Sequence, residues 1–109
     1  MELSSSHSIK GKNAIITGAR SGIGLATLRL FAQNGCNCWA IVHRDDPDFL
    51  DSITELQSEY GVWIKPVHID LENSGEIKNG LKSIIQEKLP IDILVNAAGI
   101  VSPSRLFTM

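Results

Sequence analysis

The chain has 109 residues, of which 43% are hydrophobic and 20% are charged. This composition is ordinary for one small globular domain and argues against a disordered chain. The formal net charge at pH 7 is -2, with 10 lysine and arginine residues against 12 aspartate and glutamate residues. Because no run of cations provides a basic surface, we expect neither nucleic acid nor an anionic membrane as a partner.

The N-terminal segment MELSSSHS is short and polar, without the basic and apolar regions of a secretory signal. No stretch approaches the roughly 18 consecutive apolar residues that indicate a transmembrane helix. We therefore predict a flexible tail over residues 1–10, one domain over residues 11–109 and a cytoplasmic protein.

A strand, a glycine-rich loop and a helical pattern open the domain. The strand is predicted over residues 13–17 and the loop, GARSGIG, over residues 18–24; Ser21 is expected to cap the helix and Gly35 to end it. The apolar positions that recur at helical spacing are Ile23, Ala26, Leu30 and Phe31. Unpaired N–H groups and the helix dipole favour an anion at such a helix start, so this segment predicts a phosphate site.

Two more strand-helix units are predicted to follow. An apolar run over residues 38–42 is typical of a central parallel strand, and Asp46 with Pro47 predicts the start of a helix that ends at Gly61. The apolar stripe of this helix is expected at Phe49, Leu50, Ile53, Leu56 and Tyr60. A third strand is predicted over residues 63–70, and Pro66, which has no N–H to donate, assigns it to a sheet edge.

A third helix is predicted to begin near Asn73, with Glu76 as its capping-box partner, and to end before Pro90. Its inward positions are expected at Ile77, Leu81, Ile84 and Ile85, and a fourth strand is expected over residues 91–96. Because parallel crossovers are right-handed and the third strand lies at an edge, we predict an α/β fold. It is the N-terminal half of a Rossmann doubly wound parallel sheet with strand order 3-2-1-4.

Cys36 and Cys38 are separated by one residue at the start of the second strand. A disulfide between such positions is strained, and no further ligands stand at metal-like spacing. We expect both to be small buried side chains, and we expect no metal site.

The glycine spacing differs from the plain Rossmann fingerprint, because Thr17 precedes Gly18 and the later glycines are Gly22 and Gly24. Asp70 ends the third strand, and the sequence NAAG over residues 96–99 follows the fourth. With these three motifs, the chain from about Gly11 onward resembles the classical short-chain dehydrogenase/reductase family.

The resemblance implies a dinucleotide whose diphosphate lies at the glycine loop, with Asp70 at the adenine amino group. It also implies that Asn96 ties the sheet together near the adenosine ribose; members usually have a second asparagine where this chain has Ala97. The predicted cofactor-binding residues are Gly18, Arg20, Ser21, Gly22, Ile23, Gly24, His43, Arg44, Asp70, Asn96, Ala97 and Gly99.

The end of the second strand bears on the choice of cofactor. Val42 stands where an acidic side chain would hold a ribose 2′-hydroxyl, and His43 and Arg44 follow it. With Arg20 in the loop, these cations suit a 2′-phosphate, so we predict NADP(H) rather than NAD(H). The alternative for Arg44 is a solvated cation offset by the acids at 45–46.

The resemblance further implies an oxidoreductase that reduces a ketone or 3-oxoacyl substrate, as the 3-oxoacyl carrier-protein reductases of this family do. The family's catalytic serine and Tyr-x-x-x-Lys pair are expected beyond residue 109. The one tyrosine, Tyr60, is followed four residues later by Ile64, so we predict no catalytic residue in this chain and no activity from it alone. A full-length form would take a small-molecule or acyl-carrier substrate. The alternative is a non-catalytic nucleotide-binding or interaction module.

The fourth strand is expected to leave one edge of the sheet uncovered. Unpaired edges recruit further strands, so we predict a homo-oligomer or pairing with a further segment.

Overall fold

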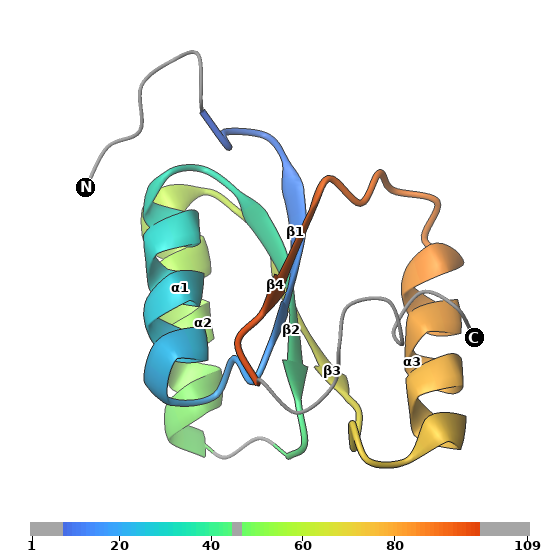
Figure 1. Ribbon diagram of the computed structural model, residues 1–109. Coiled ribbons are helices and arrows are strands. Elements are labelled where there is room, and N and C mark those ends of the chain that lie inside the picture. Colours follow the sequence, from blue (N-terminus) through green and yellow to red (C-terminus); the bar gives the residue numbers. More distant parts are fainter. Residues whose placement is uncertain (1–7, 45–46, 99–109) are drawn as a thin grey trace.

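The computed structural model describes residues 8–44 and 47–98. Strands and helices alternate along these ranges (Figure 1) as β1 (Asn13–Thr17), α1 (Gly22–Gln33), β2 (Asn37–Val42), α2 (Pro47–Tyr60), β3 (Ile64–His68), α3 (Ser74–Ile85) and β4 (Ile93–Asn96). The four strands form one sheet in the order β3-β2-β1-β4, and every neighbouring pair is parallel. The predicted fold class and strand order are confirmed.

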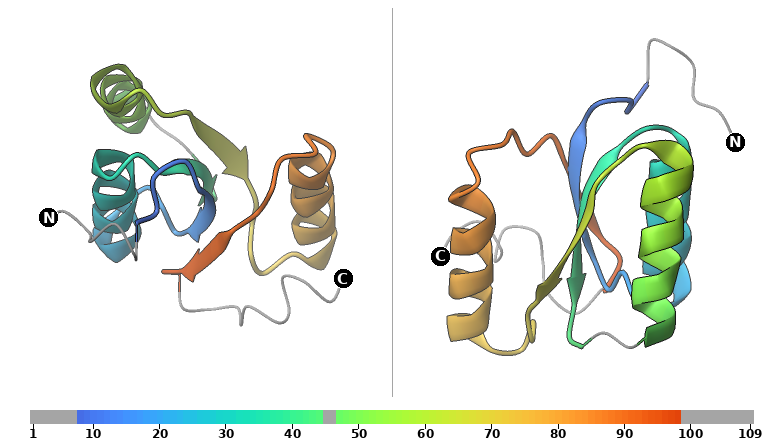
Figure 2. Two further views of the ribbon diagram at one scale, coloured as in Figure 1. Left: turned by 90° about the horizontal axis from the view of Figure 1, so that it is seen from above. Right: turned by 180° about the vertical axis from the view of Figure 1, so that it is seen from behind.

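Three layers result from this connectivity. Helices α1 and α2 cover one face of the sheet and α3 covers the other (Figure 2). Because all four strands are parallel, their carboxyl ends share one edge of the sheet. Ligands of open α/β sheets bind at this edge.

Alternation along the central strand divides the core into two parts. Ile16 contributes to the cluster on the α1 and α2 side, whereas its neighbour Ile15 contributes to the cluster on the α3 side. Trp39 of β2 is fully buried in the second cluster and meets Trp63 edge to face, with 4.9 Å between ring centroids. Both faces of β1 and β2 are therefore covered, as the continuous apolar run over residues 38–42 predicted for β2.

The inward face of α1 agrees with the predicted one only in part. Phe31 packs partly buried against the core, but Ile23 is 77% exposed and Ala26 is also exposed. The buried residues are Gly24, Leu28 and Ala32. These buried residues follow an i, i+4 spacing that starts at the smallest residue of the first turn. The close approach of Gly24 to the preceding loop, described below, turns this face toward the sheet.

Single apolar positions of α2 and α3 were also predicted wrongly. Leu50 is 39% exposed and Ile85 is 64% exposed. The buried residues are Phe49, Ile53 and Leu56 in α2 and Ile77 and Ile84 in α3. The predicted Tyr60 and Leu81 pack against the core partly buried. A helix on a sheet surface buries a narrow stripe, so apolar residues beside that stripe remain in solvent.

The two edges of the sheet are β3 and β4, and β3 lies where Pro66 placed it. Both strands are shorter than predicted, since residues 63–70 contract to Ile64–His68 and residues 91–96 to Ile93–Asn96. The N–H of Ile64, at the start of β3, donates to Gln57 Oε1 over 2.9 Å. Pro66 has no N–H, so part of this edge is closed to a further strand.

A polar contact anchors the carboxyl end of α3 to the sheet. The indole N–H of Trp39 donates to Glu87 Oε2 over 2.9 Å, and Lys65 forms an ion pair with the same carboxylate. Lys65 Nζ also lies 4.7 Å from the centroid of the Trp63 ring. Lys65 and then Trp39, both hydrogen-bonded to the carboxylate, lower the pKa of Glu87 from its ordinary value.

Cys36 and Cys38 are free and buried. A hydrogen bond with Cys36, and then burial, raise the pKa of the Cys38 thiol far above its ordinary range, so this thiol stays protonated. Over residues 8–44 and 47–98, no group of three or more histidine, cysteine or acidic residues could hold a metal ion. Within the same ranges, no helix has the length and hydrophobicity needed to cross a membrane.

Of the predicted tail, residues 8–10 belong to the described part of the chain. There Ile9 packs against the α1 and α2 side of the core, and Lys10 N–H donates to Ser8 Oγ over 3.1 Å. The flexibility of the earlier residues stays a prediction. The predicted cap at Asp46 lies outside the described residues.

Candidate dinucleotide-binding site

The loop between β1 and α1 has a backbone that glycine makes possible. Gly18 and Gly22 have φ values of +62° and +57°, in the left-handed region that other residues rarely adopt. A Cβ at Gly18 would lie 3.1 Å from the Cα of Ala98, so the loop passes close to the chain that leaves β4. Glycine is therefore required at position 18 both by the left-handed backbone and by the close contact with Ala98.

The start of α1 leaves amide groups for a ligand. The first helical hydrogen bond runs from Leu25 N–H to Ser21 O over 3.3 Å, so the amides of Gly22, Ile23 and Gly24 have no acceptor within the helix. Ser21 occupies the N-cap position in an extended conformation, but its side chain makes no capping hydrogen bond, contrary to the prediction. These amides and the helix dipole suit an anion.

Gly24 is required by the packing of the loop. A Cβ there would lie 1.9 Å from the carbonyl oxygen of Gly18. The clash is with the loop itself. Gly24 thus allows α1 to pack against the loop, and a side chain would distort the site before any ligand arrived.

A hollow of about 320 Å³ opens at the carboxyl ends of the strands. It is lined by Gly18, Ile41, His43, Ile69, Asp70, Leu71, Glu72 and Ala98. Three of the predicted cofactor-binding residues, Gly18, His43 and Asp70, meet here from three separate loops. The volume is at the low end for small-molecule sites, and it suits one part of a dinucleotide rather than the whole.

Asp70 and His43 face each other across this hollow. His43 Nε2 lies 4.0 Å from Asp70 Oδ2, and the two side chains are 77% and 35% exposed, respectively. The other carboxylate oxygen, Asp70 Oδ1, accepts from the N–H of Glu72 over 3.0 Å. One oxygen of Asp70 is therefore held by the backbone, and the other lies on the His43 side.

The predicted cations do not all gather at the hollow. Arg20 lines a separate depression of about 280 Å³ between α1 and α2, together with Leu25, Arg29, Asp48, Phe49 and Ser52. Arg44 follows His43 and is exposed. Of Arg20, His43 and Arg44, only His43 lines the hollow.

A buried hydroxyl joins β1 to β4 beside the hollow, and its residue was not among those predicted for the site. Thr17 Oγ1 donates to Asn96 Oδ1 over 2.9 Å and accepts from the N–H of Ala98 over 3.1 Å. Thr17 is fully buried, so this contact is shielded from water. Asn96 therefore contacts the neighbouring strand at the sheet end, and Ala98 is held against Gly18. In the sequence, the one signal for this role of Thr17 was that a polar residue ends an otherwise apolar strand.

The remaining predicted residues have simpler positions. Ala97 is half-buried after the end of β4, beside Asn96. Gly99 lies outside the described residues.

The fold and the site together define a class of protein. A parallel sheet ordered β3-β2-β1-β4, with a glycine loop between β1 and α1, is one half of a Rossmann-type nucleotide-binding fold. The family model of the short chain dehydrogenases matches residues 12–108. The chain belongs to this family.

Individual relatives are similar over most of this chain. A short chain dehydrogenase of Pseudocercospora fijiensis is 37% identical over 92 residues, which cover 84% of this chain and 29% of the relative. A 3-oxoacyl-(acyl-carrier-protein) reductase of Chlamydia pneumoniae is 32% identical over 101 residues, covering 91% of this chain and 39% of the relative.

Among solved structures, L-sorbose reductase of Gluconobacter frateurii, complexed with NADPH and L-sorbose, superposes with a TM-score of 0.73. It is 34% identical, and the match covers 86% of this chain and 35% of the reductase. The chain thus spans 29% to 39% of the length of these three proteins.

Proposed function

We propose that this chain binds a nicotinamide dinucleotide, NADP(H) in preference to NAD(H), as the cofactor-binding part of an oxidoreductase. The observation that carries the proposal is the hollow where Gly18, Asp70 and Ala98 meet, next to the start of α1. The amides of the first turn of that helix have no acceptor within it, which suits a diphosphate.

In this proposal the diphosphate and the adenosine part of the cofactor have a place on the chain. The diphosphate lies against the amides of Gly22 and Ile23, and the adenine lies in the hollow with its amino group toward Asp70. Asn96 and Ala97 lie near the adenosine ribose. When bound, the dinucleotide supplies or accepts a hydride; this chain binds and orients it.

The preference for NADP(H) depends on the end of β2. Val42 is 2% exposed and offers no carboxylate to a ribose 2′-hydroxyl, while His43 and Arg44 follow it as exposed side chains. Cations at this position favour a 2′-phosphate through charge-assisted hydrogen bonds. The NADPH in the L-sorbose reductase structure is consistent with this preference.

Titration of tryptophan fluorescence with each reduced cofactor tests both parts of the proposal. We expect NADPH to bind at least about tenfold more tightly than NADH, as one charge-assisted hydrogen bond predicts. Arg44→Ala should weaken NADPH binding and leave NADH binding unchanged, whereas the control Lys82→Ala, on the last turn of α3, should change neither. Equal affinities would contradict the preference, and the absence of binding would contradict the proposed function.

We propose reduction of a ketone or 3-oxoacyl compound for a protein that carries this chain together with the family's serine and Tyr-x-x-x-Lys residues. The relatives support this substrate class, since one is a 3-oxoacyl-(acyl-carrier-protein) reductase and another an L-sorbose reductase. Tyr60 lies in α2 and is followed by Ile64 rather than lysine at the fourth position. We therefore expect the 109-residue chain alone to bind NADPH without oxidising it when an acetoacetyl thioester or L-sorbose is added.

The second candidate is a nucleotide-binding module that does no chemistry. The placement of the one tyrosine in α2, away from the hollow, favours it over catalysis by this chain itself. Steady oxidation of NADPH by the chain would contradict this candidate.

Self-association is proposed from the outer edge of β4. All four residues of this strand are half-buried, and within the described residues it pairs with β1 alone. An unpaired edge recruits another strand. Analytical ultracentrifugation should show a dimer or larger species, and a stable monomer at high concentration would contradict it. The cytoplasmic location stays a prediction from the sequence.

A further inference from the structure

The cap of α3 departs from the ordinary capping box. In that motif the carboxylate three residues into the helix accepts from the N–H of the N-cap residue itself. Here the N–H of Asn73 donates to Asp70 O over 2.9 Å, and Glu76 Oε1 accepts from the N–H of Asp70 over 3.0 Å. The other half of the motif is intact, because Glu76 N–H donates to Asn73 Oδ1 over 3.1 Å. The Glu76 carboxylate thus accepts from the N–H of Asp70, three residues before the N-cap residue Asn73.

Three hydrogen bonds hold Asp70 and leave one of its carboxylate oxygens without a backbone partner among the described residues. Its N–H donates to Glu76, its C=O accepts from Asn73, and its Oδ1 accepts from the N–H of Glu72. These contacts fix the backbone and one carboxylate oxygen. The remaining oxygen, Oδ2, lies on the side of His43, where Asp70 lines the hollow.

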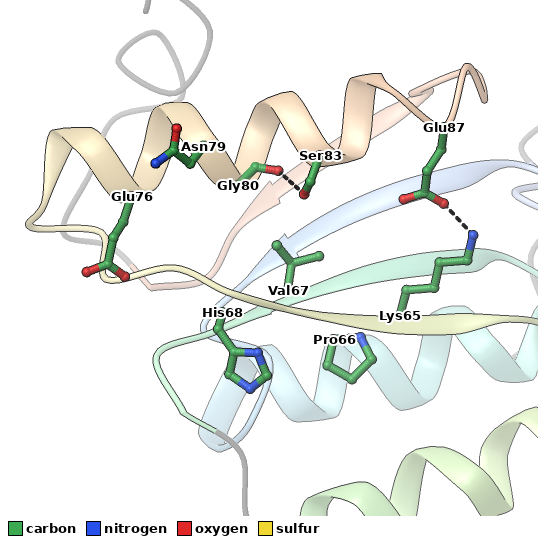
Figure 3. A pocket seen from close by; sticks show the side chains of 9 residues that line it. All are labelled: Lys65, Pro66, Val67, His68, Glu76, Asn79, Gly80, Ser83 and Glu87. Atoms are coloured by element: carbon green, nitrogen blue, oxygen red, sulfur yellow. Dashed lines mark hydrogen bonds and ion pairs between the residues drawn. The ribbon is translucent and has the colours of Figure 1, made fainter.

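Glu76 reaches Asp70 from outside the hollow. Its side chain projects from the first turn of α3 and lines a different depression, of about 580 Å³, between β3 and α3 (Figure 3). Glu76 is exposed, so water could satisfy the Asp70 N–H in its place. The carboxylate is therefore not needed to avoid a buried unpaired donor, and its effect is to define where Asp70 lies.

We propose that Glu76 is a positioning residue of the cofactor site, which holds Asp70 so that Oδ2 meets the adenine amino group. This inference rests on the proposed function and adds a residue that does not touch the cofactor. If the carboxylate is removed, Asp70 loses one of the three hydrogen bonds that fix its position, and the hydrogen bond to the amino group weakens. The rest of the site, including the phosphate loop of α1, is unaffected.

The experiment compares NADPH with its hypoxanthine analogue, which has a carbonyl group where adenine has the amino group. In the wild-type chain we expect NADPH to bind about tenfold more tightly, since a hydrogen bond to a charged acceptor is lost in the analogue. In Glu76→Ala this ratio should fall below about threefold. In Glu76→Gln it should be retained, because the amide oxygen can still accept from Asp70 N–H.

Asn73→Ala is the matched control, since it removes the cap of the same helix and leaves the atoms of the Glu76–Asp70 bond in place. Asn73→Ala should lower thermal stability and keep the preference for NADPH over the analogue. If the role of Glu76 were merely structural, Glu76→Ala would weaken the binding of NADPH and of the analogue equally. A full preference in Glu76→Ala would overturn the inference while leaving the proposed function intact. The absence of NADPH binding to the wild-type chain would overturn both, and a wild-type chain that binds the two dinucleotides equally would overturn the role of Asp70.

Discussion

Gly22 and Gly61 form a matched pair for testing whether the glycine loop before α1 binds the diphosphate of the cofactor. Both have a left-handed backbone, with φ values of +57° and +66°, and a Cβ added at either position would meet no atom within 4 Å. Gly22 begins α1 at the carboxyl edge of the sheet, whereas Gly61 follows α2 at the opposite edge. The two substitutions to alanine therefore cause the same backbone strain at different places.

We expect the two variants to be destabilised equally but to differ in how tightly they bind NADPH. Each alanine should lower the free energy of unfolding by about 1–2 kcal/mol, the cost of a left-handed residue with a Cβ. Gly22→Ala should also disturb at least one charge-assisted hydrogen bond to the diphosphate, which contributes about 1.5–3 kcal/mol. That loss weakens NADPH binding by about 10- to 100-fold, while Gly61→Ala binds as the wild type does.

Urea unfolding followed by circular dichroism measures the stability of the two variants, and fluorescence titration with NADPH measures binding. Titration is performed well below the unfolding midpoint of each variant, so that loss of folded protein does not imitate loss of affinity. If Gly22→Ala and Gly61→Ala bind NADPH equally, the amides at the start of α1 do not hold the cofactor.

Substitutions at three further positions test individual contacts. Gly24→Ala should destabilise the chain by about 1–3 kcal/mol, as overpacking does, and should weaken NADPH binding as well, measured by the same two assays. Glu87→Ala should lower the free energy of unfolding by about 1–3 kcal/mol, because it leaves the buried indole N–H of Trp39 without its acceptor. Lys65 and then Trp39 lower the pKa of Glu87 in the folded state. The contribution of the Glu87 carboxylate to stability is therefore full above the ordinary carboxyl pKa of about 4.3 and is lost as the pH falls below it. Urea titrations should show a smaller difference in unfolding free energy between wild type and Glu87→Ala at pH 3 than at pH 7. Thr17→Val should destabilise the chain by about 1–2 kcal/mol and weaken NADPH binding, whereas Thr17→Ser, which keeps the hydroxyl, should do neither; equal behaviour of the two would contradict the role of that hydroxyl.

Much of the architecture could be predicted because its signals are local. Pro66 lacks an N–H, which assigned its strand to an edge in any arrangement of the sheet. The spacing of Asn73 and Glu76 predicted the start of α3, and Glu76 N–H does donate to Asn73 Oδ1. The glycine loop was predicted in the same way, since Gly18 and Gly22 occupy a backbone region that few other residues adopt.

Predictions failed where two segments had to be brought together. The periodicity of α1 offered several apolar residues, and nothing in their spacing showed that Ile23 faces solvent while Gly24 packs on the loop. In the same way, the capping pattern of α3 could not show that the Glu76 carboxylate bonds Asp70 instead of the cap residue. The separation of Arg20 from His43 also depends on where α2 packs.

By itself, the sequence determined the succession of strands and helices, the strand order and the glycine loop before α1, since these follow from hydrophobic periodicity, turn residues and the handedness of parallel crossovers. Only the tertiary structure decided which face of each helix is buried and how Asp70, Thr17 and Asn96 are held. Those contacts join residues that are far apart in the chain or on separate elements, and local sequence rules contain no distance between such residues.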